Sequence, residues 1–261
     1  MTKISIIIPT YNALTRLSNC IESIRSHTIA EQYELIIVDN GSTDGTAEYC
    51  IRERITFVSL PVNMGCPNAC NIGISIASGD QLLLLNNDVI CTPHWLSNLT
   101  QALSSSPDIG IVGPSSNDAL GLQHVEVTYS SMEEFQQMAA LNNSLDPNRW
   151  LEAQRIAGWC FLFRREVLNK VGLFDESFSP GHYEDDDYCF RARAAGYKLL
   201  VCQDVILYHE GGVSYKASYT SEDIEAIIAR NYHLFINKWH VDPHLFIDSK
   251  IRSTPKGGEV Q

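Results

Sequence analysis

Short apolar runs alternate with stretches of helical periodicity along the first half of the chain. The apolar runs are residues 4–9, 33–38, 55–60, 80–85 and 109–113, and the helical stretches between them include residues 13–28, 63–77 and 93–103. Continuous β-branched and leucine runs are typical of strands buried on both faces. Strands that alternate with amphipathic helices indicate a mostly parallel sheet flanked by helices. The sequence therefore predicts an α/β fold with a Rossmann-like first half.

Polar clusters follow three of the predicted strands directly. They occupy residues 10–12, 39–41 and 86–88. In parallel sheets, ligands bind beyond the carboxyl ends of the strands. Because all three clusters fall at such ends, we expect them to form one binding site.

The second half of the chain follows a looser pattern. It contains a helix expected near residues 131–141 and a strand over 154–164 that Gly158 interrupts. A helix over 184–194, a strand over 197–203 and a second long helix over 221–239 follow. We expect a first half at 1–113, a second half of the same domain at 114–215, a helical segment at 216–250 and a flexible tail at 251–261.

Charge and hydropathy exclude several classes of function. The 261 residues include 31 acidic and 19 basic side chains, a net charge of −12, which argues against non-specific binding of nucleic acid. No apolar run reaches the roughly 18 residues of a membrane span. With no signal-peptide pattern at the start, we expect a cytoplasmic protein with at most a peripheral contact at the inner face of a membrane. The eight scattered cysteines fit buried thiols in a reducing compartment.

Asp39 and Asp88 are the candidate ligand-binding carboxylates of the first half. Asp39 either forms the turn that follows its strand or accepts the ring N–H of uracil or thymine. Asp88 follows four leucines and two asparagines, so it either caps the next turn or holds Mg²⁺ or Mn²⁺ beside a diphosphate.

An acidic run at residues 184–187 is the strongest local anomaly. Acids favour the first turn of a helix through its dipole, but this effect accounts for one or two carboxylates and not for four. Crowding of carboxylates raises their pKa values, and a carboxylate with a raised pKa can act as a general base. His209 ends a strand before two glycines and is either structural or a metal or phosphate contact. Trp159 either belongs to a sheet face or lines a sugar site.

Six motifs in order resemble those of the family-2 glycosyltransferases with the GT-A fold. They lie at residues 5–12, 34–46, 63–73, 86–88, 158–175 and 184–209, so the resemblance covers roughly residues 3–215. It implies inverting transfer of a sugar from a nucleotide diphosphate sugar to a hydroxyl of a glycan, lipid-linked or protein-linked acceptor. The half at 1–113 would then bind the nucleotide sugar, and the half at 114–215 would bind the acceptor and carry the catalytic base. The protein could also form a homodimer.

The resemblance also implies roles for individual residues. Asp185 would be the catalytic base, and Asp88 with His209 would bind Mn²⁺ or Mg²⁺. The acceptor would contact Trp159, Glu184 and Asp187. The donor nucleotide would contact Pro9, Thr10, Tyr11, Asn12, Asp39, Asn63, Gly65, Asn71 and Asn87.

Departures from the family pattern refine this expectation. Asn86 replaces the first carboxylate of the D-x-D metal motif, and Arg149-Trp150 precedes the base instead of following it, unlike in processive synthases. The Asn-Asn-Asp form is similar to the rhamnosyltransferase-like branch, which favours a dTDP-sugar, with a UDP-sugar close behind. A non-catalytic binding module on the same fold is the alternative. A sugar nucleotidyltransferase is weaker because no basic Gly-rich loop follows the first strand, and a dehydrogenase lacks its G-x-G-x-x-G.

Overall fold

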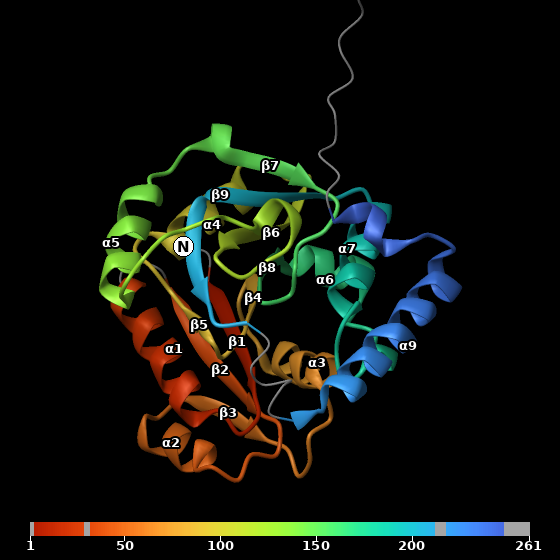
Figure 1. Ribbon diagram of the computed structural model, residues 1–261, viewed down its shortest axis with the longest axis horizontal. Coiled ribbons are helices and arrows are strands. Elements are labelled where there is room, and N and C mark those ends of the chain that lie inside the picture. The colour runs from red at the N-terminus through yellow and green to blue at the C-terminus, as the bar shows by residue number, and fades with distance from the viewer. Residues whose placement is uncertain (1–2, 29–31, 212–217, 248–261) are drawn as a thin grey trace, which may run out of the picture.

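The computed structural model describes residues 3–28, 32–211 and 218–247, and within these ranges nine strands form one twisted sheet (Figure 1). The strands follow the order β3-β2-β1-β4-β8-β6-β9-β5, and β7 pairs with β9 outside this path. Their bounds are β1 (Ile4–Thr10), β2 (Tyr33–Asp39), β3 (Thr56–Ser59), β4 (Gln81–Leu85), β5 (Val89–Ile90), β6 (Ile109–Ser116), β7 (Trp150–Ala153), β8 (Cys160–Arg164) and β9 (Lys198–His209).

The first four strands of the sheet pair in parallel, as the sequence pattern predicted. β1 pairs with both β2 and β4, and β2 pairs with β3. The later strands mix directions: β6 is parallel to β9, but β8 lies antiparallel between β4 and β6. β5 and β7 also run antiparallel to β9. The α/β class is confirmed, and antiparallel pairs enter only through strands that follow β4 in the chain.

Helices cover both faces of this sheet (Figure 1). Successive side chains of a strand point to opposite faces, so Ile6 packs with α1 and α4 while Ile7 packs with α3 and α7. The helices are α1 (Leu14–His27), α2 (Thr46–Arg52), α3 (Cys66–Ile76), α4 (Trp95–Ser104), α5 (Met132–Asn142), α6 (Arg165–Val171), α7 (Glu184–Ala194) and α9 (Ser221–Trp239). None of the helices in the described part of the chain is long and apolar enough to cross a membrane.

The strand expected over residues 154–164 is wrong in its first half. Residues 154–159 form a loop between β7 and β8. These residues do not form a strand because their backbone N–H groups donate hydrogen bonds to side chains and not to a neighbouring strand. Ala157 N–H donates to Gln123 Oε1 at 2.8 Å, and Gly158 N–H donates to Asp185 Oδ2 at 2.8 Å. This loop therefore joins α7 to the sheet.

The helices expected at 184–194 and 221–239 have those bounds as α7 and α9. β9 continues to His209, well past the end expected at residue 203, because β6 follows it through a register shift after Pro114. The expected tail at 251–261 lies outside the described residues. The division into donor and acceptor halves stays a prediction.

Candidate active site

The ends of β1, β2 and β4 lie side by side, and their polar residues interact. Parallel pairing sets Thr10 opposite Asp39. Asn87, two residues past β4, donates a hydrogen bond from Nδ2 to Thr10 Oγ1 at 2.8 Å. All three side chains are buried. The polar clusters predicted at these strand ends therefore form one edge of the sheet.

Asp39 holds the turn that follows β2. Its Oδ1 accepts a hydrogen bond from Ser42 N–H at 2.9 Å, and its Oδ2 accepts one from the Ser59 hydroxyl at 2.8 Å. Asn12 is exposed beside this turn, where its N–H donates to Ser42 Oγ and its Oδ1 accepts from Thr43 N–H. The turn-forming interpretation of Asp39 is thus correct. A carboxylate has about four acceptor sites, so Asp39 keeps capacity for a further donor.

The loop before α3 is built on Asn63 and Gly65. Asn63 Oδ1 accepts from Asn40 Nδ2 at 2.8 Å and from Gly65 N–H at 3.0 Å. Gly65 has a φ of 89°, and a Cβ there would lie 2.8 Å from the Cα of Pro180. Only glycine allows this close approach, which brings the loop against the chain that precedes α7.

The prediction that Asn71 contacts the donor nucleotide needs a correction. Its Nδ2 donates to Phe174 O and Glu176 Oε1, and its Oδ1 accepts from Phe174 N–H, each at 2.9 Å. Both amide protons are used inside the protein. Asn71 therefore fixes α3 to the short helix η3 (Glu176–Phe178), and it does not face a nucleotide.

Asp88 and His209 are brought together by the pairing of β5 with β9, which sets Val89 opposite His209. Asp88 Oδ1 and His209 Nε2 lie 3.3 Å apart, and both residues are buried. Neither atom forms a well-aligned hydrogen bond with any described residue. Two buried polar atoms that face each other without a well-aligned hydrogen bond keep the capacity to bind a ligand.

The surroundings of His209 orient its ring toward Asp88. Its Nδ1 lies 3.0 Å from Asp118 O, which leaves Nε2 for the carboxylate. Burial lowers the pKa of His209, but the facing carboxylate of Asp88 outweighs burial, and the net pKa is raised. The indole of Trp159 stacks on the imidazole with ring centroids 5.1 Å apart. Trp159, predicted to contact an acceptor, thus lies against the imidazole.

Asp185 lies in the first turn of α7 and is held by backbone donors. Its Oδ2 accepts from Gly158 N–H at 2.8 Å, and its Oδ1 accepts from Asp186 N–H at 2.9 Å. Gly158 is followed directly by Trp159, which stacks on His209. A single loop therefore links the candidate base to the Asp88–His209 pair.

The two carboxyl groups that flank Asp185 on α7 have raised pKa values. Burial, followed by repulsion from Asp185, raises the pKa of Glu184 well above its ordinary value. Burial also raises the pKa of Asp186, and Arg155 opposes that rise. Glu184 is half-buried, and its Oε2 has no partner among the described residues. This geometry is compatible with the acceptor role predicted for Glu184.

Asp187 was predicted to bind the acceptor, and this prediction is wrong. Its side chain is fully buried. Arg191 Nε lies 2.8 Å from Oδ2, while Lys238 Nζ at 2.7 Å and Trp239 Nε1 at 2.8 Å approach Oδ1. Asp187 therefore fastens α9 to α7 and presents no oxygen to an acceptor.

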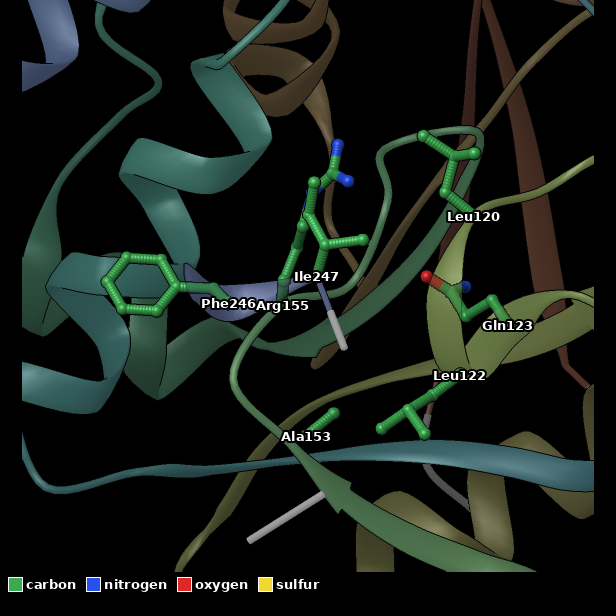
Figure 2. A pocket seen from close by; sticks show the side chains of 7 residues that line it. All are labelled: Leu120, Leu122, Gln123, Ala153, Arg155, Phe246 and Ile247. Atoms are coloured by element: carbon green, nitrogen blue, oxygen red, sulfur yellow. The ribbon is translucent and has the colours of Figure 1, made fainter. Parts of the chain in front are cut away.

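Arg155 was missed by the sequence analysis. It belongs to the loop between β7 and β8, and its Nε lies 2.7 Å from Asp186 Oδ1. Its aliphatic stem lines a small cavity with Ala153, Leu122 and Ile247, and Figure 2 shows its guanidinium directed away from Ala153 and Leu122. A single arginine in the otherwise uncharged stretch 153–163 was the available signal.

Residues 5–172 match the family described as Glycosyl transferase family 2. The chain belongs to this family. Its GT-A fold is shared with the mannosyltransferase PcManGT from Pyrobaculum calidifontis, solved in complex with GDP-Man and Mn²⁺. That likeness has a TM-score of 0.60 at 20% sequence identity, and it covers 79% of this chain and 56% of the other.

Two relatives of this family member are longer proteins. It is 30% identical over 231 residues to the uncharacterized protein y4gI of Sinorhizobium fredii and 29% identical over 215 residues to the glycosyltransferase AglE of Haloferax volcanii. The alignments cover 81% and 79% of this chain but only 25% and 66% of the two relatives. The chain thus spans between a quarter and two thirds of the length of these relatives.

Proposed function

We propose that this family member transfers a sugar from a nucleoside diphosphate sugar to an acceptor hydroxyl with inversion at the anomeric carbon. The buried Asp88–His209 pair is the observation that carries the proposal. It lies past β4 at the edge where Thr10 and Asp39 end their strands, and Trp159 connects it to the loop that holds Asp185. Donor, cation and base sites are then contiguous.

A divalent cation fits the residues present. Asp88 Oδ1 and His209 Nε2 are buried and lack well-aligned partners, and among the described residues no cluster of three His, Cys, Asp or Glu side chains is present to enclose an ion. Diphosphate oxygens and water would complete the shell. When bound, the cation would neutralise the charge that gathers on the departing diphosphate. An imidazole ligand favours Mn²⁺ over Mg²⁺.

The donor nucleotide would lie along the ends of β1 and β2. Asp39 would accept the ring N–H of uracil or thymine, which favours UDP- or dTDP-sugars. Pro9, Thr10, Tyr11 and Asn12 would line this side of the nucleoside. The Asn63–Gly65 loop and Asn87 support the same edge through Asn40 and Thr10.

On the acceptor side, Asp185 would take the proton of the attacking hydroxyl as the new bond forms. Its two backbone donors, Gly158 N–H and Asp186 N–H, fix the carboxylate plane. Attack from the side opposite the diphosphate gives inversion. Glu184 would hydrogen-bond the acceptor, which belongs to a glycan, lipid-linked or protein-linked class.

Calorimetry with free nucleotides tests this proposal without knowledge of the acceptor. UDP, dTDP, GDP and CMP are titrated into the protein with and without Mn²⁺, and Asp88→Asn serves as the matched variant. We expect UDP or dTDP to bind at least about tenfold more tightly with Mn²⁺ in the wild type and equally with or without Mn²⁺ in Asp88→Asn. Binding of no diphosphate under any condition would overturn the assignment of the donor site.

A further inference from the structure

The acidic residues in the first turn of α7 differ in how many positively charged side chains contact them. Arg191 and Lys238 both contact Asp187, at 2.8 and 2.7 Å. Among the described residues, the ion pairs of Asp185 and Asp186 come from Arg155 alone. Removal of either cation at Asp187 leaves the other in place, whereas Arg155 has no substitute.

Arg155 bridges the candidate base and the next carboxylate. Its Nε lies 2.7 Å from Asp186 Oδ1, and its Nη2 lies 3.7 Å from Asp185 Oδ2. The side chain is 21% exposed, so little water screens these charges. Three residues further along the same loop, Gly158 N–H donates to that same Oδ2 atom. The loop thus places one charge and one hydrogen bond on a single oxygen of the base.

We propose that Arg155 is a positioning residue whose guanidinium places a positive charge beside Asp185 and orients this carboxylate toward the proton of the acceptor hydroxyl. The inference rests on the proposed function, because it assumes that Asp185 is the base. Among the described residues, the ion pairs of Arg155 are with Asp185 and Asp186 and not with the donor edge or the Asp88–His209 pair. It acts through Asp185.

Apart from Arg155, the charged or titratable groups around Asp185 are acidic, neutral or weakly basic. Burial disfavours the charge of Arg155, but Asp186 and Asp185 outweigh burial and raise the pKa of the guanidinium, which therefore stays protonated. Burial lowers the pKa of His182, which faces Asp185, so its imidazole is mostly neutral near pH 7. The remaining neighbours carry negative charge or none and are Cys66 on α3 and Glu184, Asp186 and Cys189 on α7.

The titration of the Asp185 carboxyl tests this inference directly. Protein labelled with ¹³C at the aspartate carboxyls is titrated by NMR, and the Asp185 signal is the one missing from Asp185→Asn. In Arg155→Gln we expect the midpoint of this signal to rise by about one pH unit or more, because a cation near a carboxylate favours its charged form. Arg155→Lys keeps the charge and should stay near the wild type. Arg191→Gln is the matched control and should not move the signal.

A second pair of variants covers the case in which Arg155→Gln does not fold. The double variant Arg155→Gln/Asp186→Asn removes both charges of the buried pair, so that no unpaired Asp186 carboxylate is left, and Asp186→Asn alone is its reference. We expect the midpoint to be higher in the double variant than in Asp186→Asn by about one pH unit. An unmoved midpoint in either comparison overturns the inference. Full glycosyl transfer by Asp185→Asn would instead overturn the proposed function, so the two failures are distinguishable.

Discussion

Two buried acidic regions of this molecule differ in where their positive charge comes from. Asp187 on α7 is fully buried and is contacted by Arg191 and Lys238. Asp88 is nearly as buried, but the ion-pair partner it has among the described residues is His209, without a well-aligned hydrogen bond. A buried carboxylate needs a compensating charge. Where the chain provides two permanent cations, the acid builds structure, and where it provides only an imidazole that can lose its proton, we infer that the acid also binds a cation from outside.

The largest effect is expected from removal of the proposed base, Asp185, which shares the first turn of α7 with Asp187. Asp185→Asn keeps the shape of the side chain but cannot accept the acceptor proton. We expect kcat to fall by about 10²- to 10⁴-fold while nucleotide binding by calorimetry changes less than about twofold. Equal losses in binding and turnover would show that Asp185 belongs to the donor site.

Removal of the structural acid should cost stability. Asp187→Ala leaves Arg191 and Lys238 next to a cavity without their carboxylate. We expect the free energy of unfolding to fall by about 3–5 kcal/mol in urea titrations. A loss below about 1 kcal/mol would contradict the role of Asp187 in fastening α9 to α7.

The acids of α7 also predict a dependence of stability on pH. The pKa of Asp186 is raised in the folded state, so the folded state holds its proton at pH values where the unfolded chain has released it. Its contribution is present below the unfolded pKa near 4 and is lost as pH rises through the folded pKa. The stability of wild type relative to Asp186→Asn should therefore fall with pH, by up to about 1.4 kcal/mol per unit. A difference that rises with pH would contradict this.

The smallest effect is expected from Asp88→Asn in the absence of metal. Asp88→Asn removes a buried charge and also its pairing with His209, two effects of opposite sign, so the free energy of unfolding should change by no more than about 1 kcal/mol. With Mn²⁺ and UDP or dTDP added, the midpoint temperature of thermal unfolding should rise in the wild type and stay unchanged in the variant. A large loss without metal would mean that Asp88 is structural, like Asp187.

The sequence predicted the fold and the edge of the sheet that carries the site, because both follow from local pattern. The strands before residue 114 are continuous apolar runs, and their polar ends mark the edge where Thr10 and Asp39 lie. The roles predicted for individual side chains were wrong where a role depends on partners that are distant in the sequence. Asn71 faces Phe174, and Asp187 faces Lys238, and neither pairing leaves a trace in local spacing. Arg155 was missed for the same reason.

Electron paramagnetic resonance of bound Mn²⁺ tests the central claim most directly, namely that the Asp88–His209 pair is the cation site. The protein is loaded with Mn²⁺ and UDP or dTDP, and hyperfine coupling to a ligand ¹⁴N is measured by spin-echo modulation. We predict a ¹⁴N coupling in the wild type that disappears in His209→Gln but persists in Asp185→Asn. Bound Mn²⁺ with no nitrogen coupling, or a coupling that survives in His209→Gln, would contradict the account.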